Sequence, residues 1–132
     1  MHAPALTPVD VSSIKALGQP FIEACLDRDW DALLALCTDD VVFMPPDEPV
    51  LSGREAVRRY LEKYPVMRTF DFEFTHIEGQ DHLAVAHGTF TMTIEVDPSP
   101  VDLTGKFMDA FRRDDHGRWL YASVIWNSDQ PA

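Results

Sequence analysis

One carboxylate in the sequence occupies a position that could support acid–base chemistry. The segment Gly105–Arg113 is predicted to form a β-strand, in which alternate side chains point to the same face, so Asp109 shares its face with Phe107 and Phe111. If that face is interior, desolvation raises the pKa of the Asp109 carboxyl, and the neutral acid can donate a hydrogen bond to a developing oxyanion or act as a general acid. The alternatives are a buried aspartate satisfied by backbone or tyrosine groups, and an aspartate on a solvent face.

The last predicted strand, Trp119–Asn127, supplies a second part of the candidate site. Strict alternation divides it into one face with Leu120, Ala122, Val124 and Trp126, and another with Trp119, Tyr121, Ser123 and Ile125. The first face leaves room for a ligand beside Trp126, although ordinary core packing explains the same pattern. The predicted ligand-binding residues are Phe21, Phe43, Met44, Tyr60, Phe90, Phe107, Phe111, Val124 and Trp126.

A second catalytic candidate is Asp40, which lies between a predicted helix and a predicted strand. Aspartates at such junctions also cap helices or hold turns, so this residue has a structural alternative. The histidines and cysteines form no HxH, HExxH or CxxC spacing, and we therefore expect no metal site. Because the sequence also lacks a GxSxG elbow, a GxGxxG motif and a phosphate-binding Gly-Lys-Ser/Thr loop, we expect no cofactor.

The composition limits the partners of the chain. Its 132 residues include 22 acidic and 11 basic side chains, giving a formal net charge of −11, which argues against nucleic acid and anionic membranes as partners. No stretch approaches the ~20 apolar residues needed to span a bilayer. The start, Met1–Leu6, lacks the features of a signal peptide. With Cys25 and Cys37 expected to be reduced core thiols, we expect a cytoplasmic protein.

Helical patterns occupy the first half of the chain. Thr7 is predicted to cap a first helix, which the segment Gly18–Pro20 kinks or interrupts. A second helix is predicted over about Trp30–Leu36. The segment Ser52–Glu55 has the spacing of a capping box and is predicted to open a third helix that runs to about Lys63.

The rest of the chain is predicted to form a short strand and, later, a meander of four antiparallel strands. Gly88 indicates a bulge or bend within the meander. The predicted strands are Val41–Met44, Thr69–His76, His82–Glu95, Leu103–Arg113 and Trp119–Asn127. This order predicts a single α+β domain over residues 1–132, in which a strongly curved antiparallel sheet packs on about three N-terminal helices and encloses an apolar pocket.

Four short strings, taken together in their order and spacing, carry a family resemblance. They are Arg28-Asp29-Trp30-Asp31-Ala32-Leu33-Leu34, Thr38-Asp39-Asp40-Val41-Val42-Phe43, Pro46 with Ser52-Gly53-Arg54-Glu55-Ala56-Val57, and Phe111-Arg112-Arg113-Asp114-Asp115-His116-Gly117-Arg118-Trp119. Over about residues 9–128 the chain resembles the nuclear transport factor 2-like superfamily, within it the SnoaL-like and ketosteroid isomerase-like groups. The resemblance implies a cone-shaped sheet with a deep apolar pocket, and a homodimer formed through the outer sheet face.

The resemblance can be examined residue by residue for catalytic groups. Ketosteroid isomerases use an aspartate base, with a tyrosine and a protonated aspartate as oxyanion donors. By resemblance, Asp109 stands at the protonated aspartate and Trp126 at an aromatic pocket position. Phe21 stands at the tyrosine position without a hydroxyl, and Pro45, next to Met44, stands at the base position and cannot accept a proton. We therefore do not expect steroid isomerisation by that mechanism.

Three functions remain open from the sequence. The first is a cofactor-independent isomerase, cyclase or lyase that acts on a small apolar, carbonyl-containing molecule, with Asp109 as its acid or base. The second is a module that binds such a molecule without converting it, which the loss of two catalytic positions favours. The third is a dimerisation or protein-interaction module that uses the outer sheet face.

Overall fold

The computed structural model describes residues 4–130 and shows four helices and six strands. The helices are α1 (Pro8–Lys15), α2 (Gly18–Asp27), α3 (Trp30–Leu34) and α4 (Arg54–Glu62). The strands are β1 (Cys37–Met44), β2 (Leu51–Ser52), β3 (Met67–Gln80), β4 (Leu83–Val96), β5 (Ser99–Arg113) and β6 (Trp119–Ser128). This architecture confirms the predicted α+β class.

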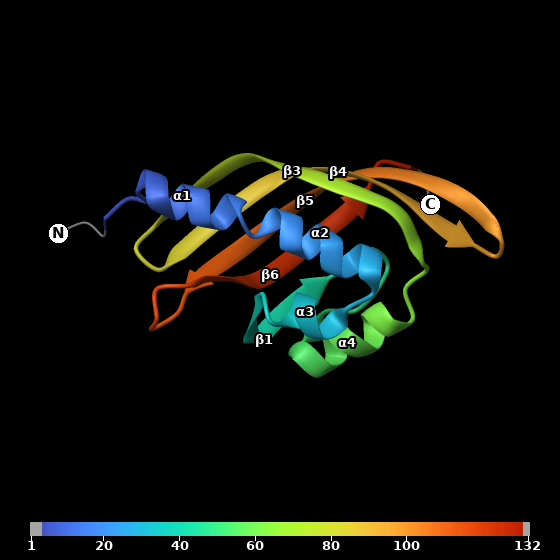
Figure 1. The fold of residues 1–132 in the computed structure, drawn as a ribbon, viewed down its shortest axis with the longest axis horizontal. Coiled ribbons are helices and arrows are strands. Elements are labelled where there is room, and N and C mark those ends of the chain that lie inside the picture. The colour runs from blue at the N-terminus through green and yellow to red at the C-terminus, as the bar shows by residue number, and fades with distance from the viewer. Residues whose placement is uncertain (1–3, 131–132) are drawn as a thin grey trace.

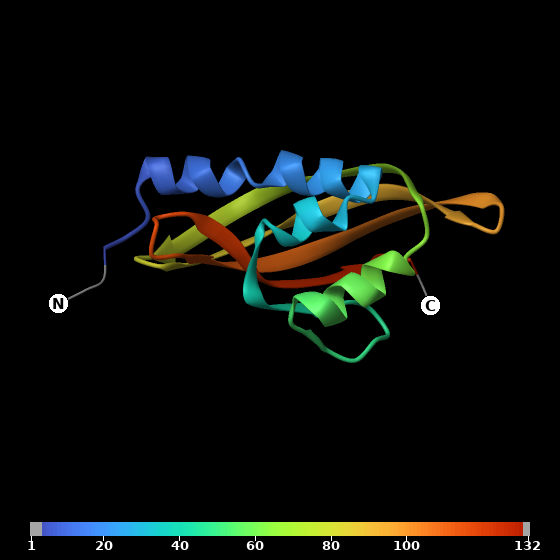
Figure 2. The same ribbon diagram turned by 60° about the horizontal axis from the view of Figure 1, so that its bottom comes forward.

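All six strands form one curved, unclosed sheet (Figure 1), in the order β2-β1-β6-β5-β4-β3. The strands β3 to β6 form the predicted antiparallel meander, whereas β1 pairs in parallel with β6. In Figure 2, α1 and α2 lie end to end along one side of the sheet, and α4 lies beside β1. The space between the helices and the concave side of the sheet holds the core. In the part of the chain that the structure describes, no helix has the length and apolar character needed to cross a membrane.

The first two helices meet at a break, as the sequence predicts. Thr7 caps α1 through a capping box, because its hydroxyl accepts from the backbone N–H of Asp10 while the Asp10 carboxylate accepts from that of Thr7. The chain turns at Ala16 and Leu17, before the predicted Gly18–Pro20 segment, and resumes as α2.

Two predicted boundaries are wrong. Ser52 does not cap the third predicted helix, because it pairs with Val42 as part of β2, and Gly53 with φ +89° stands at the N-cap instead. A glycine adopts this left-handed region without the penalty that a Cβ atom imposes. The residues Thr38 to Asp40, expected to lie between a helix and a strand, belong to β1, which begins at Cys37 and not at Val41.

The bulge predicted at Gly88 lies on the neighbouring strand. The register between β3 and β4 shifts between Phe74 and His76, directly opposite Gly88. A Cβ atom at Gly88 would lie 1.8 Å from the carbonyl oxygen of Glu73. The glycine therefore allows the bulged backbone of β3 to approach β4 closely, and the bulge strengthens the local twist of the sheet.

Candidate functional site

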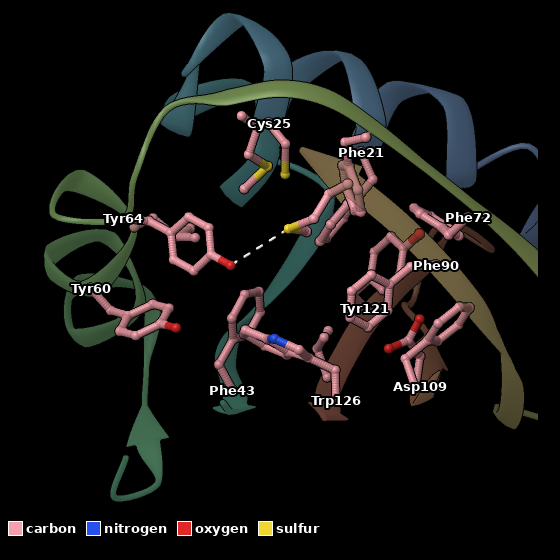
Figure 3. A pocket seen from close by; sticks show the side chains of 16 residues that line it. Phe21, Cys25, Phe43, Tyr60, Tyr64, Phe72, Phe90, Asp109, Tyr121 and Trp126 are labelled. Carbon is pink, nitrogen blue, oxygen red and sulfur yellow. Dashed lines mark hydrogen bonds between the residues drawn. The ribbon is translucent and has the colours of Figure 1, made fainter. Parts of the chain in front are cut away.

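A cavity opens between the concave side of the sheet and the helices α2 and α4 (Figure 3). It offers about 80 Å³ in which the centre of a water molecule could move, several times the ~10–15 Å³ that one water requires. Its walls are apolar and mostly aromatic. Eight of the predicted site residues line it, namely Phe21, Phe43, Tyr60, Phe90, Phe107, Asp109, Val124 and Trp126.

Asp109 lies on β5 with its carboxyl at the cavity wall. Regular alternation along β5 places it on the interior face with Phe107 and Phe111, and its side chain is 4% exposed. Its Oδ1 atom is buried and has no hydrogen-bond partner among the described residues. Burial raises the pKa of this carboxyl well above its usual range, since removing water disfavours the charged form. Burial therefore favours the neutral form of the group, which can donate one hydrogen bond.

Aromatic rings supply the dry surroundings of Asp109. Phe107 packs edge-on against Phe72 and Phe74, with ring centroids 5.3 and 5.8 Å apart. Phe74 packs in the same manner against Phe111, at 5.9 Å. These edge-to-face contacts hold the rings in fixed positions around the carboxyl. The aromatic residues that alternate along β3 thus contribute to the apolar surroundings of the carboxyl.

Tyr121 is the most important residue that the sequence reasoning missed. The pairing of β5 with β6 shifts between Ala110 and Phe111, so Ala122 forms a bulge and Tyr121 points into the cavity with Val124. Strict alternation had placed these two residues on opposite faces. No local feature of the sequence signals this bulge.

The Tyr121 hydroxyl donates a hydrogen bond to the carbonyl oxygen of Leu17, at 3.3 Å, where α1 and α2 are interrupted. Burial is the largest cause that raises the pKa of this phenol. Tyr121 therefore stays neutral, and its hydrogen bond connects β6 to the break between α1 and α2.

Seven further lining residues also escaped prediction: Cys25, Leu61, Tyr64, Met67, Phe70, Phe72 and Met92. The lining residues on β3 and β4 follow from the alternation of these strands once the face that points to the interior is known. Tyr64 lies just beyond the end of α4, one turn after Tyr60, so helical spacing pointed to it.

Three predicted site residues lie outside the cavity lining. Met44 follows Phe43 on β1, and successive residues of a strand point to opposite faces. Phe111 is fully buried in the core, where it packs against Phe74 and Tyr121. Asp40 is exposed, at the irregular stretch of β1 where the pairing with β6 is interrupted.

The remaining ionisable groups of the lining are all protonated at neutral pH. Burial raises the pKa of the Cys25 thiol to about 12, and it also raises the pKa values of the Tyr60 and Tyr64 phenols. Among the described residues of the lining, none offers a ready base. Pro45, at the position where a base was considered, is buried and has no side-chain acceptor. In the part of the chain that the structure describes, no group of three or more His, Cys, Asp or Glu side chains is placed to hold a metal ion.

Four aromatic rings surround the part of the cavity nearest α4. Figure 3 shows Tyr60 and Tyr64 on one side of the cavity, with Phe43 and Trp126 facing them. The ring centroids of Tyr60 and Trp126 lie 6.3 Å apart, and those of Phe43 and Trp126 lie 5.9 Å apart at right angles. The Tyr64 hydroxyl donates to the sulfur of Met92, at 3.6 Å. Tyr60, Tyr64 and Trp126 are half-buried, whereas Phe43 and Asp109 are buried, so solvent reaches part of the first three side chains.

The chain was compared with known families and structures. The model of the SnoaL-like domain matches residues 19–122. No curated protein matches the chain. A ketosteroid isomerase-like protein from Erwinia carotovora atroseptica superposes with a TM-score of 0.86 at 18% identity, covering 95% of this chain and 100% of that one. A conserved protein from Planctomyces limnophilus gives 0.79 at 22% identity, with 92% and 99% covered.

A further solved structure, an NTF2-like protein from Cytophaga hutchinsonii, gives a TM-score of 0.76 at 17% identity, covering 93% of this chain and 99% of that one. At these identities the superpositions establish the shared fold.

Proposed function

Since this chain belongs to the SnoaL-like domain family, we propose that it binds a small, largely apolar molecule in the cavity and holds its carbonyl oxygen with Asp109. The neutral carboxyl donates the hydrogen bond, and the aromatic walls bury the rest of the molecule. A ligand site of this kind, apolar with one placed polar group, is typical of small-molecule pockets.

The unpaired carboxyl of Asp109 is the observation that carries this proposal. A buried polar atom without a partner costs free energy, and native structures retain few of them without a functional reason. Ligand binding would supply the missing partner. Because the carboxyl is neutral, it complements an acceptor such as a carbonyl and offers no advantage to a cationic group at that position.

A pair of matched ligands tests this proposal. We expect α-tetralone, a bicyclic ketone, to bind more tightly than tetralin, which has nearly the same shape without the oxygen. Replacing Asp109→Leu should lower the affinity for α-tetralone by roughly tenfold, because one buried hydrogen bond is lost, and leave tetralin binding nearly unchanged. Isothermal titration measures both. Equal affinities of the wild-type protein for the two compounds would contradict the proposal.

A second candidate function is proton transfer on the bound carbonyl compound. A neutral carboxyl can give its proton from one oxygen to the carbonyl oxygen while its other oxygen takes a proton from the adjacent carbon. One O–H and one C–H bond break, the enol forms, and the carboxyl ends neutral. Two observations favour proton transfer as a function. The carboxyl of Asp109 is desolvated, and the described residues of the cavity lining include no other base.

Hydrogen exchange separates binding from catalysis. If Asp109 transfers protons, the protein should speed exchange of the α-hydrogens of α-tetralone in D₂O, as followed by NMR. The variant Asp109→Asn should abolish this acceleration while its amide keeps a donor for binding. A wild-type protein that binds the ketone without speeding exchange is a binding module alone.

We also infer a homodimer formed through the outer face of the sheet. Met108 on β5 and Ile125 on β6 pair across the strands on this face and are 51% and 43% exposed. Exposed apolar side chains in one patch are characteristic of interaction surfaces. Replacing Met108→Lys should shift the protein toward a monomer, which light scattering after gel filtration would detect. A monomeric wild-type protein would refute this inference.

A further inference from the structure

The aromatic rings at the cavity mouth come from three separate elements. We define the mouth cluster as Phe43 on β1, Trp126 on β6, Tyr60 on α4 and Tyr64 just after α4 (Figure 3). Tyr60 and Tyr64 lie one helical turn apart, with ring centroids 5.9 Å apart and planes inclined by 53°. The Trp126 ring is inclined by 62° to Tyr60 and by 90° to Phe43. The four rings therefore pack against one another from three elements and together line this part of the cavity.

The basic side chains Arg54, Arg58 and Arg59 of α4, the helix that carries Tyr60, are each paired with a carboxylate, of Asp39, Asp31 and Glu55. Among the described residues that line the cavity, none is a lysine or arginine. Glu48, in the loop before β2, lies near enough for its charge to be among the causes, after burial and Tyr64, that raise the pKa of Tyr60. The chain as a whole carries a formal charge of −11, which attracts cations and repels anions.

The nearby cation Arg28 does not occupy the cluster. Its guanidinium donates to the backbone carbonyl oxygens of Tyr64 and Glu62, at 3.0 and 3.1 Å. It also lies over the ring of Trp30, 5.4 Å from the centroid. Arg28 is therefore held on the backbone beyond the cavity wall, and the cluster presents its rings to the cavity.

We propose that the mouth cluster binds an organic ammonium group, so that the ligand of this cavity carries a methylated or alkylated amine at its outer end. The proposal rests on the proposed function in that it names the chemistry of the second end of the same ligand. The faces of aromatic rings carry negative potential, and ammonium groups with alkyl substituents are recognised by aromatic boxes. The ligand's neutral carbonyl end lies inward at Asp109, beyond Phe43 and Trp126.

Choline and 3,3-dimethyl-1-butanol test the proposal, because the two molecules have the same shape and differ in the charge of the head group. We expect choline to bind the wild-type protein at least about tenfold more tightly, in line with a cation–π contribution from several desolvated rings. Tyr60→Leu should remove most of this preference, whereas Tyr60→Phe, the matched control, should keep it. Circular dichroism and thermal melting verify that each variant is folded.

A second pair of variants tests the contribution of charge. Glu48→Gln should lower choline affinity a few-fold and leave 3,3-dimethyl-1-butanol binding unchanged. Glu73→Gln removes the same charge from an exposed position on β3, and it should have little effect on either molecule. Added salt should weaken choline binding more than binding of the alcohol.

Two outcomes would overturn the proposal. Equal affinity for choline and the alcohol would show that the cluster is an ordinary apolar wall, and no detectable choline binding would show that it is not a cation site. Neither outcome affects α-tetralone binding, which depends on Asp109. Conversely, Asp109→Leu should leave choline binding intact, so failure of the carbonyl proposal is distinguishable from failure of the cation proposal.

Discussion

Two buried aspartates of this protein have opposite environments. Among the described residues, Asp10 and Asp109 are the buried charged side chains. Asp10 accepts from the indole N–H of Trp119 at 3.3 Å and forms an ion pair with Arg113 at 3.0 Å, in addition to its role in capping α1. Asp109 has an unpaired buried oxygen and aromatic neighbours.

The pKa shifts of the two carboxyls follow from this difference. The backbone N–H of Thr7 is the largest cause that lowers the pKa of Asp10, with the Trp119 and Arg113 contacts adding to it. Burial alone raises the pKa of Asp109. Its partners therefore favour the ionised form of Asp10, whereas burial favours the neutral form of Asp109. The comparison teaches that burial by itself does not single out a candidate acid, and that the missing hydrogen-bond partner distinguishes Asp109 from Asp10.

Breaking the network of Asp10 should have the largest effect on stability. Asp10→Ala removes the acceptor for Thr7 and Trp119 and leaves Arg113 without its ion-pair partner. We expect Tm to fall by about 5–10 °C, because several partners lose their bonds together. Thermal circular dichroism measures the change. Asp115→Ala, at an exposed position in the β5–β6 turn, is the control, and an equal fall for both variants would contradict the structural role of Asp10.

Replacing the other aspartate should have the opposite sign. Asp109→Leu removes a buried polar group without a partner and adds apolar contact, so the free energy of unfolding should rise by about 1–3 kcal/mol. Urea denaturation measures this difference. A loss of stability comparable to that of Asp10→Ala would mean that the Asp109 carboxyl has a structural partner.

The pH dependence of stability should separate the two groups further. Folding raises the pKa of Asp109 above its ordinary 3.8, so its stabilising contribution is full below that pH and is lost as pH rises toward the folded pKa, by at most about 1.4 kcal/mol per pH unit. Wild-type protein should therefore lose stability relative to Asp109→Asn as pH rises from 4. For Asp10, with its lowered pKa, the contribution is lost on acidification below 3.8. Denaturation at a series of pH values measures both, and a constant difference would refute the buried, neutral state of Asp109.

The smallest effect is expected at the residue beside Asp109. Tyr121→Phe removes the hydrogen bond to the Leu17 carbonyl and should cost about 1 kcal/mol of unfolding free energy. Because the ring remains, affinity for α-tetralone should stay within about twofold of wild type. A much larger loss of affinity would show that the hydroxyl contacts the ligand, which would bring Tyr121 into the site as a second donor.

Much of the fold could be predicted because its signals are local. Helical spacing located α1 and α2, and the alternation of β5 identified the face of Asp109. The family resemblance is confirmed by the match over residues 19–122. The capping-box prediction at Ser52 failed because pairing with Val42 in the sheet decided the conformation of that segment.

The cavity was harder to predict because it depends on pairing between strands. The bulge at Ala122 turned Tyr121 inward, and it arises from the register between β5 and β6. Regular alternation of β1 took Met44 to the face opposite Phe43. The aromatic face of β3 lines the cavity because α2 packs against it. No local sequence pattern reports that packing.

The parallel pairing of β1 with β6 has a consequence for synthesis of the chain. β6 lies between β1 and β5 in the sheet, although it is made after both of them. Until β6 has been made, β1 and β5 therefore each have an unpaired edge, and Phe111 of β5 lacks its ring contact with Tyr121. Such edges and apolar surfaces are prone to association. We therefore expect a chain that lacks β6 to associate more readily than the complete domain.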